Sequence, residues 1–209
     1  MALVLNGSND TITGLQINSA NIVNGSIVND DINASAAIAG TKISGGVGKI
    51  LQVVQTVKTD VFNTDVINGQ ISGDITGLTV TITPSNASNK ILISTSINAG
   101  FQDSTPTRMG ATIYKAGSVL SGAIGDSSGN IQRVSFGQEL DGYGRTCTLT
   151  GQYLDTAGST NATLYSVRIS HGSSSDKAIF INRVSSSAES NHSYHMRAIS
   201  TITAMEVAA

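Results

Sequence analysis

The chain has 209 residues, of which 39% are hydrophobic and only 12% are charged, against roughly 25% charged in ordinary globular proteins. Its formal net charge of -2 argues against nucleic acid or an anionic membrane surface as a partner, because both require clustered Lys and Arg. A low net charge with this hydrophobic content also argues against intrinsic disorder. No apolar run is long enough for membrane insertion, and the single cysteine, Cys147, excludes an intrachain disulfide.

The N-terminal segment, residues 1–44, carries a five-residue repeat of large aliphatic side chains. A helix requires apolar residues at intervals of three and four, and a strand requires every second one, so this period fits neither. Isoleucine occupies five consecutive steps, and two more isoleucines follow an interruption at Ala37. The seven residues are Ile12, Ile17, Ile22, Ile27, Ile32, Ile38 and Ile43.

Three structures are compatible with this repeat. A pentapeptide-repeat solenoid would bury the residue two positions before each isoleucine, but Asp10 and Asp30 occupy two of these positions and would be costly to bury unpaired. A loosely ordered arm is the second possibility. In the third, several copies of the chain place their isoleucines around a shared axis and bury them there. We favour this oligomeric stalk, with an N-terminal anchor.

A glycine-rich segment, SGGVGK, separates the repeat from the rest of the chain. We interpret residues 45–49 as a hinge, in which Gly45, Gly46 and Gly48 let the chain turn. A phosphate-binding loop is excluded, because Ile43 and Ile50 occupy positions where that motif requires Gly and Ser or Thr. Residues 50–209 then form a second domain.

From residue 50 onward the apolar period changes to two, which is typical of strands that bury one face. The segments LTVTITP, KILISTSIN, CTLTGQY and YSVRIS alternate in this way. The residues predicted to face the core are Leu78, Val80 and Ile82; Ile91, Ile93 and Ile97; Cys147, Leu149 and Tyr153; and Tyr165, Val167 and Ile169. We expect Cys147 to be a small apolar residue in its strand. NIQRVSFGQ, residues 130–138, is predicted as a strand too.

Turn residues separate about eight or nine such strands, and no amphipathic helix pattern is present. Short strands joined by such turns are typical of an antiparallel sandwich or jelly roll. The predicted fold is therefore all-β, with an N-terminal extended oligomeric stalk followed by an antiparallel β-sandwich or jelly-roll domain.

Patterns that suggest catalysis or metal binding are weak. GDSSG matches G-x-S-x-G, but that motif requires a helix after the serine, and no helical pattern follows Ser127. His192 and His195 would point to opposite faces of a strand, so a metal site would need one histidine from each of several copies. We interpret His171 as a loop residue. The sequence therefore predicts no enzyme, no cofactor and no metal.

Five segments together resemble tail-fibre-like virion proteins of bacteriophages, particularly those of marine and cyanobacterial phages. They are MALVLNGSNDTITGL, GSIVNDDINASAAIAGTKISG, GKILQVVQT, TGLTVTITPSNASNKILISTSIN and STITAMEVAA. The resemblance implies a homotrimer whose N-terminal region binds other virion proteins and whose β-rich distal domain contacts the host surface. It also implies a place in the virion, on the tail or the capsid surface, after synthesis in the host cytoplasm.

Recognition of a host surface glycan or protein is expected in loops, because exposed loops tolerate sequence change while the sandwich stays fixed. The candidate loops are residues 102–107, 126–130, 141–145 and 185–191. The individual candidates are Gln102, Asp103, Asp126, Asn130, Asp141, Tyr143, Arg145, Glu189 and Asn191. Alternatives from the sequence are a capsid-decorating head fibre, a structural spike without a receptor role, an enzyme of the depolymerase or esterase kind, and a monomeric bacterial sugar-binding module.

Overall fold

The computed structural model describes residues 22–23, 27–28, 32–33, 35–36, 50–102, 106–142, 144–185, 193 and 195–209. Contacts within the chain divide it into two units, Met1–Val47 and Gly48–Ala209. No helix in the described residues is long and apolar enough to cross a membrane.

The first unit contains the five-residue repeat. Three of its isoleucines are described, and they are 44% (Ile22), 54% (Ile27) and 41% (Ile32) exposed, so a single chain does not bury them. The other positions lie outside the described residues, as do the predicted hinge glycines. They are Ile12, Ile17, Ile38, Ile43, Gly45, Gly46 and Gly48. The oligomeric stalk and the hinge therefore stay predictions.

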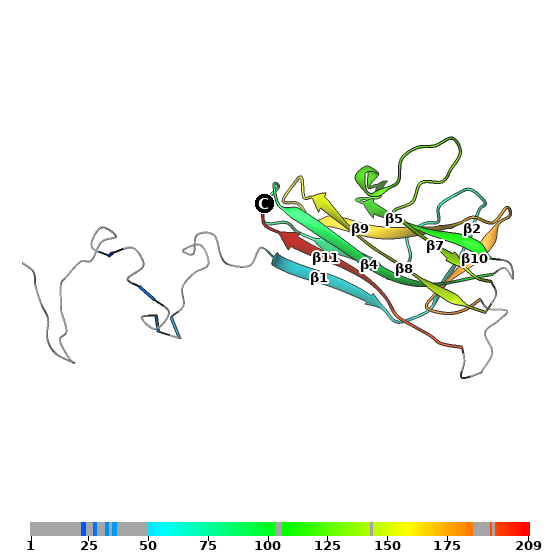
Figure 1. Ribbon diagram of the computed structural model, residues 1–209, viewed down its shortest axis with the longest axis horizontal. Helices are drawn as coiled ribbons and strands as arrows, with labels where there is room; N and C mark the ends of the chain where they lie inside the picture. Colours follow the sequence, from blue (N-terminus) through cyan, green and yellow to red (C-terminus); the bar gives the residue numbers. More distant parts are fainter. Residues whose placement is uncertain are drawn as a thin grey trace, which may run out of the picture. The chain divides into compact units, whose positions relative to one another are not determined.

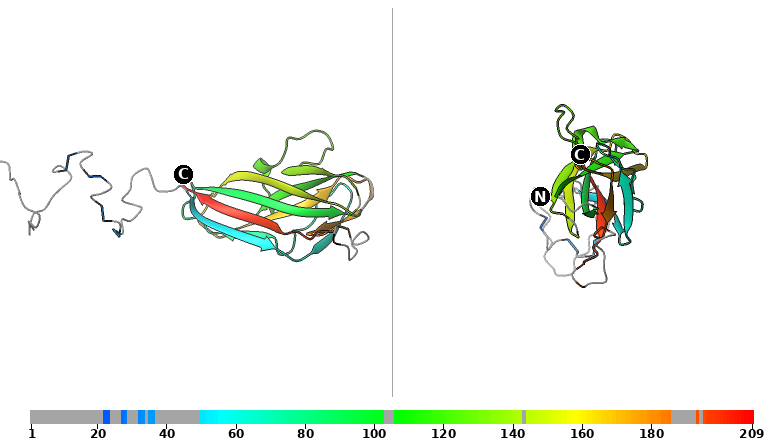
Figure 2. Two further views of the ribbon diagram at one scale, coloured as in Figure 1. Left: turned by 60° about the horizontal axis from the view of Figure 1, so that its bottom comes forward. Right: turned by 90° about the vertical axis from the view of Figure 1, so that its right-hand side faces the viewer.

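The second unit is a sandwich of two antiparallel sheets, which confirms the predicted all-β class (Figures 1 and 2). Its described residues form eleven strands, more than the sequence predicts, and one short 3-10 helix, η4 (Ser121–Ala123). The strands are β1 (Ile50–Lys58), β2 (Phe62–Val66), β3 (Thr79–Ile82), β4 (Lys90–Phe101), β5 (Thr107–Lys115), β6 (Ser118–Val119), β7 (Phe136–Leu140), β8 (Thr146–Thr156), β9 (Thr163–His171), β10 (Lys177–Ile181) and β11 (Ser200–Val207).

Strand order gives the connectivity of a jelly roll. In one sheet, called sheet A, the strands follow the order β1–β11–β4–β8. β10 also pairs with β4, past the point where β11 begins, and β2 pairs with β10. The other, sheet B, runs β3–β9–β5, and both β6 and β7 pair with β5. From β3 to β5 and from β7 to β10, successive strands alternate between the two sheets, as in a double-sheet jelly roll.

The core lies between the sheets and is made by the alternating residues that the sequence predicts. Each member of the four alternating sets is buried, except Tyr153, which is partly buried and packs against the core. Cys147 is buried in β8, with its Sγ 3.8 Å from Sδ of Met109. Period-two alternation therefore identifies the inner face of these strands correctly.

Two buried polar residues fix strand ends. Asn182 follows β10 with φ of 64°, and its side-chain amide donates hydrogen bonds to the main-chain oxygens of Lys58 and Asp60, both at 2.9 Å. Ser200 at the start of β11 donates to Oδ1 of the same asparagine at 2.6 Å. Asn182 itself follows β10, and its partners lie at the end of β1 and the start of β11. It therefore holds three strand ends together.

The second buried residue is Glu206 of β11, which is 0% exposed. Its carboxylate accepts hydrogen bonds from the main-chain N and the hydroxyl of Ser85 (2.7 Å each) and from the amides of Asn89 and Gln52 (2.6 Å each). These contacts attach the β3–β4 loop and the start of β1 to β11. The carboxylate is thus buried with its hydrogen-bonding capacity used.

Two expectations from the sequence are wrong. Residues 130–134 are not a strand, and β7 begins only at Phe136. His171 is not a loop residue but the last residue of β9, and it is 3% exposed. The outer face of β9 is also less exposed than simple alternation indicates. Ser166 and Ser170 are buried there, and Oγ of Ser166 donates a hydrogen bond to Oδ1 of Asp74 in the β2–β3 connection at 2.9 Å.

Candidate functional site

Two of the four predicted recognition loops begin and end at the same end of the sandwich. The end of β4 pairs with the start of β8 through Gly100 and Thr146, and the start of β5 pairs with the end of β7 through Thr107 and Leu140. The β4–β5 and β7–β8 loops must therefore emerge together. We call this the distal end; β1 begins and β11 ends at the opposite end, where Ile50 pairs with Val207 (Figure 1).

The described candidates in these loops are exposed. Gln102 is held to β10, because its Oε1 accepts a hydrogen bond from the main-chain N of Ala178 at 2.9 Å. Asp141 and Arg145 form an ion pair of 3.0 Å, with side chains 76% and 65% exposed respectively. Such an exposed pair contributes little to stability, so its charges can be used in binding. Asp103, Tyr143, Glu189 and Asn191 lie outside the described residues.

The third candidate loop lies elsewhere, between η4 and β7 on the outer side of sheet B. Asp126 and Asn130 are both exposed there, and the loop projects from the sandwich in Figure 1. Its base is closed by two hydrogen bonds, one from the main-chain N of Gly125 to the oxygen of Val134 (3.3 Å) and one from Nε of Arg133 to the oxygen of Gly125 (2.6 Å). The structure thus separates this loop from the distal pair.

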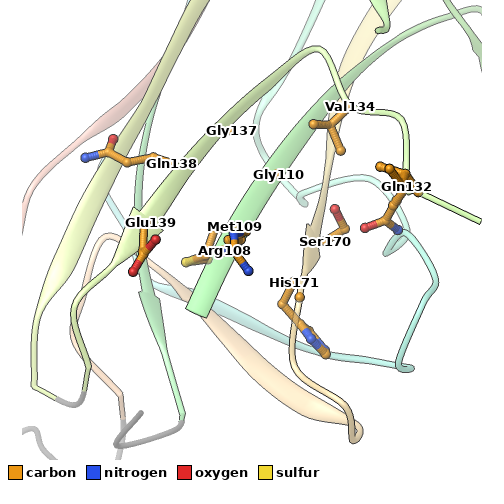
Figure 3. A pocket seen from close by; sticks show the side chains of 12 residues that line it. Arg108, Met109, Gly110, Gln132, Val134, Gly137, Gln138, Glu139, Ser170 and His171 are labelled. Atoms are coloured by element: carbon orange, nitrogen blue, oxygen red, sulfur yellow. The ribbon is translucent and has the colours of Figure 1, made fainter. Parts of the chain in front are cut away.

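A groove of about 460 Å³ lies on the outer face of sheet B, between this loop and the distal end (Figure 3). Its floor is formed by a row without large side chains, in which Gly137, Gly110 and Ser170 are neighbours on β7, β5 and β9. A Cβ atom at Gly110 would overlap Val134, so the glycine allows the loop to pack directly on the strand. Ile131 (72% exposed) and Gln132 line the loop side of the groove.

The side of the groove nearest the distal end carries opposite charges. Arg108 and Glu139 are cross-strand partners on β5 and β7, and both are exposed. Among the described residues neither takes part in an ion pair or a side-chain hydrogen bond. Figure 3 shows them across the groove from Gln132 and Val134. The groove therefore offers a cation and an anion beside an apolar wall, a combination suited to a polar, uncharged ligand.

His171 also borders the groove, but both of its ring nitrogens have partners. The main-chain N of Ser173 donates to Nδ1 at 3.2 Å, which assigns the proton to Nε2, and Nε2 donates to the oxygen of Val66 at 2.9 Å. Both ring nitrogens are therefore engaged within the fold, which leaves neither available to a metal ion. The described residues contain no group of three or more His, Cys, Asp or Glu that could hold a metal ion.

Cys147, Tyr165 and Ser127 are poorly placed for catalysis as well. Burial raises the pKa of Cys147 to about 11, so its thiol stays protonated at neutral pH. Burial and the hydrogen bond to Asp155 raise the pKa of Tyr165. Ser127 of GDSSG lies in an exposed loop followed by β7 rather than a helix, so the strand–turn–helix context of a nucleophilic serine is not met.

Comparison with known proteins adds little. No protein-family model matches the chain, and no curated protein matches it. Chains in structures of infectious bursal disease virus do match, at 16% identity and a TM-score of 0.34 for the Gx strain and 13% and 0.35 for the Gt strain. Each match covers 76% of this chain and 38% of the viral chain, so this chain spans well under half the length of either. Both TM-scores are below 0.5, so this likeness says nothing about function.

Sequence reasoning missed the groove. Its floor depends on Gly110 and Gly137 standing opposite each other, and these residues are far apart in the sequence. Only the pairing of β5 with β7 brings them together. The nearest signal in the sequence is the presence of glycines inside strand-like segments, which often marks a close approach of another part of the chain.

Proposed function

We propose that this chain is a non-enzymatic virion fibre protein that attaches a virus particle to its host cell through the distal end of the β-sandwich. The main support for this proposal is the pairing of Gly100 with Thr146 and of Thr107 with Leu140, which brings the ends of two predicted recognition loops together. The viral context comes from the resemblance of five sequence segments to phage fibre proteins.

The arrangement of the loops supports this proposal because binding surfaces are commonly loops on a rigid scaffold. Both loops connect one sheet to the other, and their ends are fixed by main-chain pairing. Asp141 and Arg145 then present opposite charges to solvent. A receptor could pair with these groups without disturbing the core.

The adjoining groove indicates the kind of receptor. Its volume of about 460 Å³ falls within the roughly 300–1,000 Å³ of typical ligand sites. Arg108 and Glu139 carry opposite charges side by side, so their fields largely cancel and give no net preference for an anionic or a cationic ligand. A neutral glycan or an uncharged protein loop of the host surface fits this chemistry best.

Multiple copies would strengthen attachment. The predicted homotrimer would present three distal ends, and the N-terminal segment would bind other virion proteins on the tail or capsid. Linked sites convert weak contacts into firm binding without new contacts, provided that all of them can reach the surface. Assembly in the host cytoplasm, with use on the virion surface, is part of the same proposal.

The absence of enzymatic activity is also proposed. His171 has both nitrogens engaged, Cys147 is protonated at neutral pH, and Ser127 lacks the turn of a nucleophile. These observations support a binding role for the described part of the chain. We likewise propose that the chain uses no cofactor.

Binding of labelled full-length protein to a panel of marine cyanobacterial strains tests the proposal. We expect the double variant Asp141→Ala/Arg145→Ala to bind a recognised strain roughly 10-fold more weakly, as loss of a binding contact worth about 1.4 kcal/mol would give. The matched control is Thr160→Ala/Asn161→Ala, which alters an exposed loop at the opposite end. Equal binding by both variants would refute the role of the distal end.

A structural spike without a receptor role is a second candidate. The exposed apolar side chains Val53 (56%) and Leu154 (52%) on sheet A favour packing against another protein surface. Electron microscopy of particles labelled with antibodies to this chain would distinguish a capsid position from a tail tip. A capsid position together with no binding to any strain would favour the spike.

A further inference from the structure

The outer face of sheet A carries an apolar row that crosses four neighbouring strands. Strand register places Val53 of β1 opposite Met205 of β11, Met205 opposite Leu92 of β4, and Leu92 opposite Leu154 of β8. The two ends of the row are 56% and 52% exposed, and the two middle residues are partly exposed. Figure 2, left, shows β1, β11 and β4 side by side on this face. The row is therefore continuous and open to solvent among the described residues.

The positions around the row are almost without charge. The next outward row is Gln55, Thr203, Ser94 and Gln152, again in register across the same strands. Only Lys90 is charged among the outward side chains of these four strands, counted from Leu51 in β1 and from Thr150 in β8. Its Nζ donates a hydrogen bond to Oγ1 of Thr156 on the same face at 2.8 Å. A charged partner would thus find no complementary charge here except Lys90, and identical copies would bring only this one like charge each.

The polar groups of this face are largely paired among themselves. Nε2 of Gln55 donates to Oγ1 of Thr203 at 2.8 Å, and Nε2 of Gln152 donates to Oγ of Ser94 at 3.5 Å. Side chains that already hydrogen bond to each other lose less when water is removed. The face can therefore be covered at low cost. By contrast, parts of the outer face of sheet B are already covered by the chain itself, since Ser166, Ser170 and Thr112 are buried there.

We propose that this face packs against a second copy of the same chain. The proposal rests on the oligomeric fibre inferred above and places the contact between the β-sandwich domains. Four strands about 4.8 Å apart and eight residues at about 3.3 Å each give a face of roughly 500 Å². Two such faces bury about 1,000 Å² in total, the lower limit for a specific interface. The contact is weak alone, and the predicted stalk would raise the effective concentration of the faces.

The row also fits a three-fold assembly. Its apolar residues lie on both halves of the sheet, with Val53 and Met205 on one half and Leu92 and Leu154 on the other. In a ring of three copies, the β1–β11 half of one copy can meet the β4–β8 half of the next. Each of the three contacts then buries about 500 Å² and the ring buries about 1,500 Å² in total, so the contacts depend on one another and on the predicted stalk. A face with apolar residues on one half only would not allow this arrangement.

Thiol accessibility in the full-length protein tests the contact. In the variant Leu154→Cys, the new thiol should react with a maleimide at least ~10-fold more slowly at concentrations where the protein is assembled than after dilution to monomer, because reaction then requires dissociation. The matched control, Ile131→Cys, introduces a thiol at a more exposed site in the η4–β7 loop, outside sheet A, and should react equally fast in both states. Native Cys147 is buried, so it adds little background.

Three results would overturn the proposal. They are a chain that is monomeric at every concentration, equal reactivity of the Leu154→Cys thiol in both states, and protection that persists in the monomer. The last would show that the chain's own N-terminal segment covers the face. As a second readout, Val53→Lys/Leu154→Lys should weaken self-association ~10-fold or more through charge repulsion, whereas Ile131→Lys/Leu164→Lys should not. If the Leu154→Cys thiol is unprotected but the protein still binds cells, this contact is refuted and the proposed attachment function is not.

Discussion

The ring of Phe136 in β7 lies against the backbone of Gly151 in β8, so closely that a methyl group at Gly151 would overlap the ring. β7 belongs to sheet B and β8 to sheet A, so this contact joins the two sheets at one edge. At the opposite edge, hydrogen bonds do the same, because Oγ1 of Thr56 in β1 donates to the oxygen of Thr79 in β3 at 2.6 Å. The sandwich is thus closed along both sides.

Substitution of Gly151 should therefore destabilise the domain. Gly151→Ala forces the Phe136 ring out of its position, and we expect a loss of about 1–3 kcal/mol in the free energy of unfolding, as for other overpacked sites. Denaturant titration measures this loss. The control is Gly125→Ala, where a Cβ would meet nothing within 4 Å. A Gly151→Ala protein as stable as the control would show that the two sheets can separate at this edge without cost.

Stability should fall in acid because of Glu206. Burial raises the pKa of this carboxyl, but hydrogen bonds from Asn89, Gln52 and Ser85 outweigh burial and lower the pKa from 4.5 to about 2. The unfolded chain therefore takes up this proton at a higher pH than the folded chain. The stabilisation is complete above the unfolded pKa and is lost as the pH falls from about 4.5 towards about 2.

Denaturation midpoints measured at a series of pH values across this window check the assignment. Glu206→Gln should lower stability at neutral pH and flatten the decline in acid, because it removes the titrating group. Glu139→Gln is the matched control, since Glu139 is exposed and has no side-chain hydrogen bond among the described residues. An unchanged acid decline in Glu206→Gln would assign the effect to other carboxylates.

The β5–β6 hairpin offers a stabilising change. Ala116 has φ of 49° and is followed by Gly117 with φ of 80°, so both residues of the turn occupy the left-handed region. Asparagine tolerates this region better than alanine, and Ala116→Asn should raise stability by ~0.5–1 kcal/mol. Thermal unfolding measures the gain. Ala162→Asn, in an exposed loop without positive φ, should give none; an equal gain there would refute the explanation from the turn.

Self-association through the five-residue repeat can be tested in the full chain. Ile22→Asn/Ile27→Asn/Ile32→Asn should convert the predicted trimer to monomer without changing thermal unfolding of the β-sandwich, because these side chains are exposed in one chain. Light scattering after size-exclusion chromatography gives the mass. The control Val23→Asn/Val28→Asn changes neighbouring aliphatic residues that lie outside the repeat. Equal masses for both variants would exclude the stalk.

The inner face of the sandwich could be predicted because it depends on local alternation. Leu78, Val80 and Ile82 are buried as expected, and the intervening threonines point outward. The outer face could not be predicted in the same way. Ser166 and Ser170 have the pattern of exposed residues, yet they are buried because distant segments fold over them. Such covering depends on tertiary contacts that no local period contains.

The candidate site was predictable only in part for the same reason. Composition identifies residues 141–145 as a loop, but its position beside residue 102 follows from the pairing of β4 with β8 and of β5 with β7. The burial of Glu206 could not be predicted from the sequence at all. In the sequence it is one charged residue in an apolar strand, and only the structure shows the amides and hydroxyl that make its burial favourable.

The main-chain pairs Gly100–Thr146 and Thr107–Leu140 have an evolutionary consequence. Backbone groups hold the strands on either side of each distal loop, so the register of the sheets does not depend on the side chains within the loops. New loop sequences can therefore be exchanged without redesign of the core. Under the proposed function, a lineage could change its host range by altering a few loop residues while the β-sandwich stays the same. A chosen binding loop could be grafted at the same positions.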